Sequence, residues 1–208
     1  MAYKLLFLDE TGNIDARTRA GMAVVVLLVG SNLQVKRVMR AARRRFPKEL
    51  PARRVYKARD APEAVTRFIL ERLATGDVEI VILRVGRRAL RHFDGDRNEL
   101  YAAVVEEAIG RAWEKHPTAR PVLHQRYEKA ELRNKITERL LRRARRLRIE
   151  LAPEDVKHRR GSPSEPGLEV VDAVAWAYAQ WRRRNKRLSY LYELVRDKTV
   201  IDDIFERE

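Results

Sequence analysis

The segment Met22–Val29 (MAVVVLLV) is apolar at every position, and this feature narrows the possible folds more than any other. It ends at the turn residues Gly30-Ser31-Asn32, and its short length and many valines are typical of a strand. A strand that is apolar at successive positions has two hydrophobic faces, so both faces must be covered. The segment therefore predicts an inner strand of a sheet that lies between layers of helices.

Three more segments are predicted strands of the same sheet. Tyr3–Leu8 (YKLLFL) and Val78–Val85 (VEIVILRV) are rich in aliphatic residues, and Pro121–Tyr127 (PVLHQRY) is a shorter candidate. Only a short connection separates Tyr3–Leu8 from the apolar run at 22–29, which favours antiparallel pairing of these two strands.

Five segments between and after these strands have the periodicity of amphipathic or apolar helices. They cover residues 33–46, 61–74, 98–113, 128–148 and 168–181. Strands that alternate with helices predict an α/β fold with a mixed β-sheet flanked by helices, in a single domain over residues 1–208. Within this domain, 157–167 (KHRRGSPSEPG) has the composition of a flexible loop, and 188–208 is interpreted as a C-terminal extension.

The chain has 45 Lys and Arg residues against 30 Asp and Glu, a formal net charge of +15, and no cysteine. The missing thiols exclude disulfide scaffolds, cysteine nucleophiles, cysteine-ligated zinc and iron–sulfur clusters. No apolar run reaches the roughly 18–20 residues of a membrane helix, so we expect a cytoplasmic protein with no membrane partner. A charge of this size favours nucleic acid, DNA or RNA, as the partner, whereas the oligomeric state stays open.

Pairs of arginines on three predicted helices are the candidate contacts to a nucleic-acid backbone, because each guanidinium can bind a phosphate. They are Arg43, Arg44, Arg142, Arg143, Arg182 and Arg183. The alternative for each pair is a solvated helix face on which the arginines pair with glutamates.

Asp9 and Glu10 stand directly after the predicted strand Tyr3–Leu8, at a place where α/β sheets commonly bind ligands. Successive side chains of a strand point to opposite faces, so at most one of the two acids is expected to point into a given site. The alternative is that both begin a polar turn, with Asp9 hydrogen-bonded to a nearby backbone amide.

Glu169 and Asp172 share one face of the apolar helix LEVVDAVAWAYAQW, because they are three residues apart. Carboxylates in such surroundings lose hydration, and a divalent cation or a neighbouring arginine would compensate that loss. We predict a shared site for Mg²⁺ or Mn²⁺ in which Asp9 and Asp172 are metal ligands and catalytic residues. Glu169 and Glu10 would assist there as further ligands or by orienting water.

The histidines have no spacing that indicates a zinc site. His124 lies within a predicted strand and is the histidine hardest to interpret as a surface residue. His158 lies in the expected loop just before the acidic helix, where it is a candidate for a mobile proton carrier.

The opening LDETGN and the late segment GLEVVDAVAWA resemble the two end motifs of the domain-of-unknown-function 3800 family. Asp9 and Asp172 stand at the matching acid positions, with Thr11 for the usual serine and Glu169 for the usual glutamine. The resemblance implies a ribonuclease H-like fold, in which a mixed sheet carries a carboxylate metal site.

The stretches RVYKARD and VLHQRYE stand where this family often has a histidine-containing motif and an aspartate. The local substitutes in this chain are Tyr56, Lys57, Asp60, His124 and Glu128. Together, these features predict a metal-dependent nuclease of ribonuclease H-like type that hydrolyses the phosphodiester bonds of DNA or RNA. The alternative is a non-catalytic nucleic-acid-binding or assembly protein that keeps the fold with a depleted active site.

Overall fold

The computed structural model describes residues 5–12, 21–93, 96–125 and 130–206, and its centre is a six-stranded sheet in the order β5-β4-β1-β2-β3-β6. The strands are β1 Leu5–Thr11, β2 Ala23–Val29, β3 Val78–Val85, β4 Arg120–His124, β5 Lys157–Arg159 and β6 Thr199–Phe205. β1, β2 and β3 pair antiparallel, whereas β4 runs parallel to β1, β5 to β4 and β6 to β3. The sheet is therefore mixed, and its first two strands pair as predicted.

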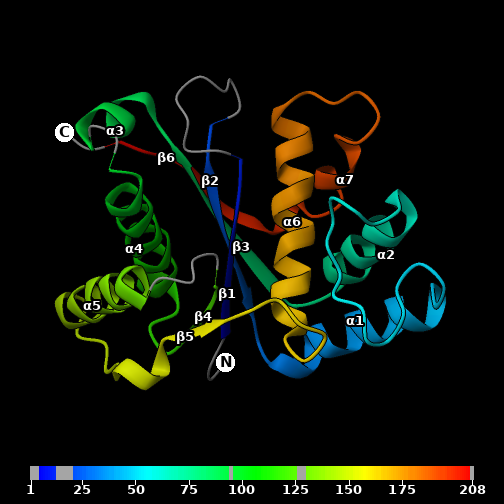
Figure 1. Ribbon diagram of the computed structural model, residues 1–208, viewed down its shortest axis with the longest axis horizontal. Helices are drawn as coiled ribbons and strands as arrows, with labels where there is room; N and C mark the ends of the chain where they lie inside the picture. Colours follow the sequence, from blue (N-terminus) through cyan, green and yellow to red (C-terminus); the bar gives the residue numbers. More distant parts are fainter. Residues whose placement is uncertain (1–4, 13–20, 94–95, 126–129, 207–208) are drawn as a thin grey trace.

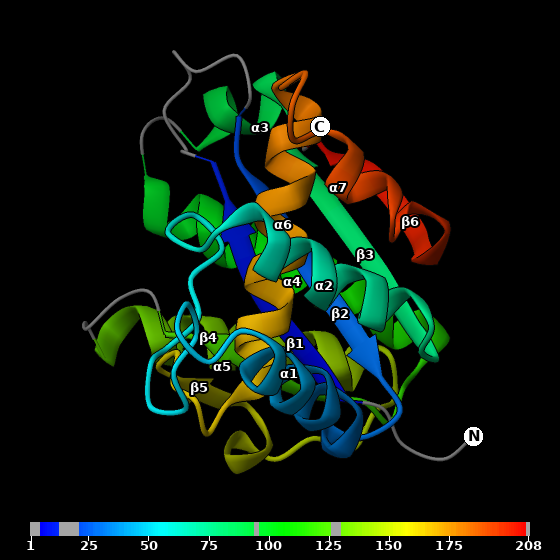
Figure 2. The same ribbon diagram turned by 90° about the vertical axis from the view of Figure 1, so that its right-hand side faces the viewer.

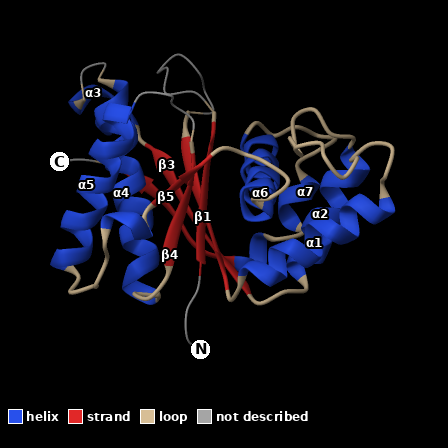
Figure 3. Cartoon of the chain, turned by 60° about the horizontal axis from the view of Figure 1, so that its bottom comes forward, coloured by secondary structure: helices blue, strands red, loops and turns tan. Residues whose placement is uncertain are grey.

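Helices cover both faces of this sheet (Figures 1 and 3). They are α1 Asn32–Arg45, α2 Glu63–Ala74, α3 Arg87–His92, α4 Arg97–Lys115, α5 Ala130–Arg146, α6 Pro166–Arg182 and α7 Tyr190–Glu193. One face carries α1, α2, α6 and α7, which lie in front of the strands in Figure 2, and the other carries α4 and α5. This layering confirms the predicted α/β fold with a mixed sheet flanked by helices. Among the described residues, no helix has both the length and the hydropathy that crossing a membrane requires.

The inner strand β2 shows why both helical layers are needed, because all seven of its residues are buried. Val24 belongs to the hydrophobic core beneath α4 and α5, whereas its neighbour Val25 belongs to the core beneath α6. The same alternation runs along β1, so consecutive residues of that strand face different helices. This alternation decides where Asp9 and Glu10 point.

The segment 157–167, predicted as a flexible loop, is a loop only in part. Its first three residues pair with β4 as strand β5, and α6 begins at Pro166, before the expected Leu168. A proline fits the first turn of a helix because its missing N–H needs no partner there. The short strand has no apolar alternation that could have indicated it, so its pairing depends on the neighbouring strand.

The C-terminal segment 188–208, interpreted as an extension, supplies the edge strand β6, which runs parallel to β3. Two acids interrupt the apolar residues of this strand and hide its pattern in the sequence. Arg84 Nε on β3 lies 3.1 Å from Asp202 Oδ1, and Arg111 Nη1 on α4 lies 3.5 Å from Asp203 Oδ2. Arginines of neighbouring elements therefore compensate the acids of the edge strand.

Candidate functional site

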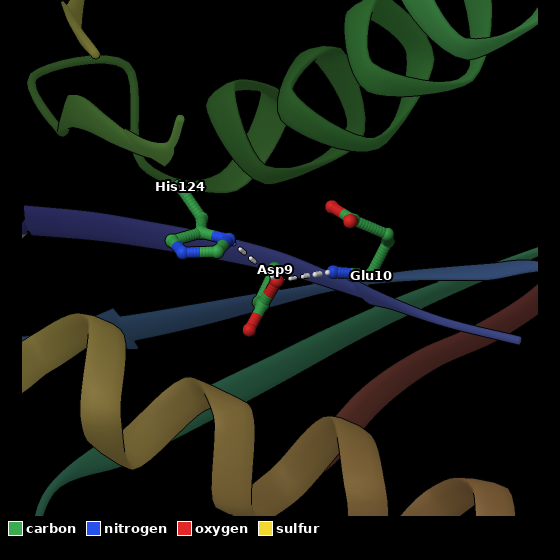
Figure 4. A group of neighbouring side chains, drawn as sticks. All are labelled: Asp9, Glu10 and His124. Atoms are coloured by element: carbon green, nitrogen blue, oxygen red, sulfur yellow. Dashed lines mark hydrogen bonds and ion pairs between the residues drawn. The ribbon is translucent and has the colours of Figure 1, made fainter. Parts of the chain in front are cut away.

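The acids at the end of β1 and one histidine of β4 meet at one edge of the sheet. β1 and β4 are parallel neighbours in which Leu8 lies opposite Leu123, so Asp9 and His124 are the next residues of their strands. The ligand atoms of Asp9, Glu10 and His124 all lie within 4.8 Å of one another (Figure 4). Parallel pairing brings the carboxyl ends of both strands to the same edge, where α/β sheets commonly bind ligands.

Asp9 is the centre of this group and is only 5% exposed. Its Oδ1 accepts a hydrogen bond from the backbone N–H of Glu10 at 2.9 Å and lies 3.4 Å from His124 Nδ1. The second carboxylate oxygen points away from both residues, toward α6 in Figure 4. The Asp9 carboxylate raises the pKa of the His124 ring, and burial of the ring opposes this shift.

Glu10 reaches the group from the other face of the sheet. The hydroxyl of Tyr101 on α4 donates a hydrogen bond to Glu10 Oε2 at 3.0 Å, whereas Asp9 follows Phe7 on the face that α6 covers. The two acids thus point to opposite faces, as predicted. The expectation that only one of them could serve a given site is wrong, because both ligand atoms belong to the same group at the strand end.

Asp172 approaches Asp9 from α6, a helix that lies very close to β1. Gly167 makes this approach possible, since a Cβ there would lie 2.3 Å from Cε1 of the Phe7 ring. The helix and the strand run in the same direction (Figure 1). Five residues along a helix cover about 7.5 Å, and two along a strand cover about 6.6 Å. Asp172 therefore lies at about the same height as Asp9 along the strand, and the charge of Asp9 acts on it.

Burial, and after it the negative charge of Asp9, raise the pKa of Asp172 to about 6. The backbone N–H of Ala58 donates a hydrogen bond to Asp172 Oδ2 at 2.7 Å. Within the part of the chain that the structure describes, Asp172 does not belong to the group whose ligand atoms lie within 4.8 Å. Glu10 and His124 are thus the partners of Asp9 in this group, the charge of Asp9 acts on Asp172 of α6, and the ligand pair Asp9 and Asp172 stays a prediction.

Glu169, predicted as a supporting catalytic acid, is held in a buried ion pair instead. Its two oxygens lie 2.7 and 2.9 Å from Nη2 of Arg43, and Oε1 also accepts the backbone N–H of Tyr56 at 2.7 Å. Burial raises the pKa of Glu169, and Arg43 and the Tyr56 amide oppose this shift. Both oxygens are engaged, so this acid has a structural role. Arg43 is engaged in this ion pair, and its contact with nucleic acid stays a prediction.

The two acids of α6 anchor the segment between α1 and α2 at the site. Glu169 accepts the backbone N–H of Tyr56, and Asp172 accepts that of Ala58, each at 2.7 Å. Lys57 lies between these two amides. The spacing of the acids on the helix therefore fixes the backbone on both sides of this lysine.

The end of the Lys57 side chain lies beside His124. A Cβ placed on Gly161 would lie 3.6 Å from Lys57 Nζ and 3.5 Å from His124 Nε2, so both nitrogens approach the same point. The positive charge of Lys57 lowers the pKa of both Asp172 and His124, in each case against larger opposing effects. The sequence indicated Lys57 only as a substitute for a family motif, and it indicated His124 also by its place in a predicted strand. The tertiary structure brings both residues to the acids.

The donor atoms of the group fit a divalent metal ion. His124 Nδ1 is buried and makes no hydrogen bond among the described residues, so the neutral ring has a lone pair available beside Asp9. Carboxylates suit both predicted ions, but Mg²⁺ takes oxygen ligands whereas an imidazole nitrogen suits transition metals. Of the two predicted ions, Mn²⁺ fits this set of donors better.

The predicted nucleic-acid arginines do not form one continuous surface. α1 and α6 lie on one face of the sheet, and α5 lies on the other (Figure 3). Arg143 on α5 is engaged with α4, where its Nη2 lies 3.0 Å from Glu114 Oε1. Arg182 is half-buried, and the predicted contacts that are exposed are Arg44, Arg142 and Arg183.

His158, a candidate for a mobile proton carrier, lies in strand β5. Its Nε2 is 3.0 Å from Thr137 Oγ1 on α5. Burial lowers the pKa of His158 to about 4, so the ring is neutral near pH 7. The interpretation as a mobile carrier is wrong, because strand pairing and this hydrogen bond hold the side chain against α5.

In comparisons with known proteins, no family model and no curated protein matches the chain. The functional interpretation therefore depends on the chemistry of the site.

Proposed function

We propose that the protein is a metal-dependent nuclease with a ribonuclease H-like fold, which hydrolyses phosphodiester bonds of DNA or RNA. The observation that carries the proposal is the convergence of Asp9, Glu10 and His124, with Asp172 facing them from α6. Converging carboxylates bind the divalent ions that phosphoryl-transfer enzymes use. The net charge of +15 supports a polyanionic substrate.

The resemblance to the domain-of-unknown-function 3800 family supports the same proposal. Asp9 and Asp172 come from the segments that resemble the two end motifs of that family, and packing of α6 on β1 brings them together. A mixed sheet with acids at the end of its first strand is also what a ribonuclease H-like fold implies.

Asp9, Glu10 and His124 are the residues that would hold the metal ion. A bound divalent cation supplies a Lewis acid for the phosphoryl oxygens and lowers the pKa of a bound water molecule. The Glu10 amide and the Tyr101 hydroxyl fix the carboxylates of Asp9 and Glu10, so the ligands are already oriented. Asp172 is anchored through Oδ2 and faces Asp9, where it can orient water or accept its proton.

Cleavage of a labelled DNA or RNA strand, with Mn²⁺, with Mg²⁺ and with chelator, tests the proposal. We expect cleavage that requires a divalent ion and is faster with Mn²⁺ than with Mg²⁺. Asp9→Asn and His124→Gln should each lower the rate about 100-fold. Asp197→Asn, which removes an exposed carboxylate outside the group, is the matched control and should keep the wild-type rate.

Thermal unfolding shows whether a variant with slower cleavage has lost its binding of the metal ion. Mn²⁺ should raise the melting temperature of the wild type and of Asp197→Asn but not that of Asp9→Asn. A wild type that binds nucleic acid and Mn²⁺ but cleaves no DNA or RNA would contradict the nuclease and favour a non-catalytic binding protein. The ion pair between Arg43 and Glu169 favours that alternative, since it leaves one predicted acid fewer at the site.

A further inference from the structure

A cavity of about 310 Å³ opens beside the carboxylate site, in the segment between α1 and α2 and the start of α2. Its volume is at the lower end of the range of small-molecule sites, which begins at about 300 Å³. Aliphatic residues, among them Leu50, Val55, Pro62 and Val65, form part of its wall. Charged residues complete the lining: Glu49, Arg54, Lys57 and Asp60. The lining therefore combines an aliphatic wall, which suits a flat apolar group, with two cations and two acids.

Lys57 connects this cavity with the carboxylate site. The residue lines the cavity, and its Nζ approaches the same point beside Gly161 as Nε2 of His124. Among the described residues, Lys57 Nζ makes no direct hydrogen bond or ion pair, and its charge acts on the nearby carboxylates of Asp172 and Glu169. An ammonium group without a direct ion pair can form a charge-assisted hydrogen bond with a ligand phosphate at this point.

The position of Lys57 is fixed before any ligand binds. Glu169 and Asp172 hold the amides of Tyr56 and Ala58, and Arg43 Nη2 donates a hydrogen bond to the carbonyl of Arg54 at 3.2 Å. These contacts connect α1 and α6 to the wall of the cavity. A ligand phosphate would thus meet a positioned cation, which lowers the conformational cost of binding.

The charge around the cavity extends beyond a single phosphate. Arg53, Arg54 and Arg59 are exposed and lie in the same short segment as Lys57. A strip of this length matches the repeating phosphates of a polynucleotide better than one small phosphorylated molecule. A cavity of about 310 Å³ admits a base only when that base has left its stack, which is the ordinary state of a single strand.

We propose that this cavity binds one unpaired nucleotide of a single-stranded nucleic acid, with the base against the aliphatic wall and its phosphate on Lys57. The inference rests on the proposed nuclease function, because the adjoining phosphodiester bond would then lie at the group of Asp9, Glu10 and His124. It adds a substrate class, which is single-stranded rather than duplex nucleic acid. It also gives Lys57 the role of a phosphate-binding residue.

Binding without cleavage tests this inference separately from catalysis. Fluorescence anisotropy in chelator compares a labelled single strand with the same strand in a duplex, for the wild type and for variants. Lys57→Met removes the ammonium group and Ala61→Phe fills the cavity. We expect each to weaken single-strand binding about tenfold or more. Lys57→Arg keeps the charge and should stay within about threefold of the wild type.

Lys115→Met is the matched control, since it removes one exposed positive charge outside the cavity lining and outside the predicted nucleic-acid contacts. Its binding should remain within about threefold of the wild type. Far-ultraviolet circular dichroism and the Mn²⁺-induced rise of the melting temperature check that the Lys57 and Ala61 variants fold with an intact acid group.

A competition experiment separates the base from the phosphate. A nucleoside 5′-monophosphate should displace the labelled strand at a lower concentration than inorganic phosphate does. Equal displacement by the two would overturn the role of the cavity wall.

The inference is overturned if the duplex binds as tightly as the single strand, or if folded Lys57→Met and Ala61→Phe bind like Lys115→Met. Selective single-strand binding that depends on Lys57, in a protein that never cleaves, would keep the inference and overturn only the nuclease. If the wild type cleaves nucleic acid and both cavity variants cleave it at the same rate, only the inference is overturned.

Discussion

Arg43 and Glu169 form a buried ion pair in which one guanidinium nitrogen lies 2.7 and 2.9 Å from the two carboxylate oxygens. Their side chains are 13% and 1% exposed. The pair joins α1 to α6, and through the Tyr56 amide it also holds the segment that carries Lys57. Glu169 therefore affects the site indirectly, because its contacts with Arg43 and the Tyr56 amide fix the position of the backbone beside Lys57.

Replacement of Arg43 by methionine should destabilise the protein by about 3–5 kcal/mol, because Glu169 would remain buried without its partner. The double variant Arg43→Met with Glu169→Leu should recover most of this loss, since it buries no unpaired charge. Urea unfolding followed by circular dichroism measures both values. Arg44→Met, at the exposed neighbour, should change stability by less than about 0.5 kcal/mol, and an equal effect of the two single variants would contradict the structural role of the pair.

Replacement of Gly167 by alanine should push α6 away from β1. The added Cβ would lie 2.3 Å from the Phe7 ring, which is 2% exposed and has no free space to enter. We expect a loss of about 1–3 kcal/mol of unfolding free energy. The cleavage rate should also fall, because Asp172 moves away from Asp9 and from the water that it would orient. The further substitution Phe7→Leu makes room for the added Cβ, so it should restore part of each of these two losses.

Gly30→Ala is the matched control for the Gly167 variant, since an added Cβ there meets no atom within 4 Å. Its unfolding free energy should stay within about 0.5 kcal/mol of the wild type. A Gly167→Ala variant as stable as Gly30→Ala would show that the close contact of α6 with β1 is not needed.

Asp172 should make the metal-free protein less stable as the pH rises from about 4 to about 6. The pKa of Asp172 is about 6 in the folded protein against an ordinary value of 3.8, so the folded state binds more protons in this window. This contribution is fully present below the ordinary pKa and is lost as the pH rises through the folded one. Asp172→Asn should remove it, and urea unfolding of both proteins in chelator from pH 4 to 8 measures the difference. Parallel profiles would contradict the prediction.

His158 should make the protein less stable as the pH falls from about 6.5 to about 4, which is opposite to the effect of Asp172. Its pKa is about 4 in the folded protein against an ordinary value of 6.5, so the unfolded chain takes up the proton first as the pH falls. Stability from this residue is complete above about pH 6.5 and is lost progressively down to about pH 4. His158→Gln should flatten that part of the profile, by on the order of 3 kcal/mol at most. Unchanged acid sensitivity of the variant would show that other groups cause it.

The sequence by itself determined the layers of this protein and the location of its first acids. The fully apolar β2 requires covered faces, the segments at 33–46 and 61–74 have helical periodicity, and Asp9 follows a buried strand. These features follow from local patterns, because the periods of strands and helices are set by the backbone of the segment itself. The short β5 and the acid-rich β6 lack such patterns and were interpreted as loop and extension.

Only the tertiary structure decided which side chains form the site. Parallel pairing of β1 with β4 brings His124 to Asp9, and packing of α6 on β1 brings Asp172 within reach of the charge of Asp9. The ion pair with Arg43 engages both oxygens of Glu169. The sequence predicted that a divalent cation or an arginine would compensate this buried acid, but it could not decide between them. Such contacts depend on which distant segments pack together, and no local periodicity encodes that choice.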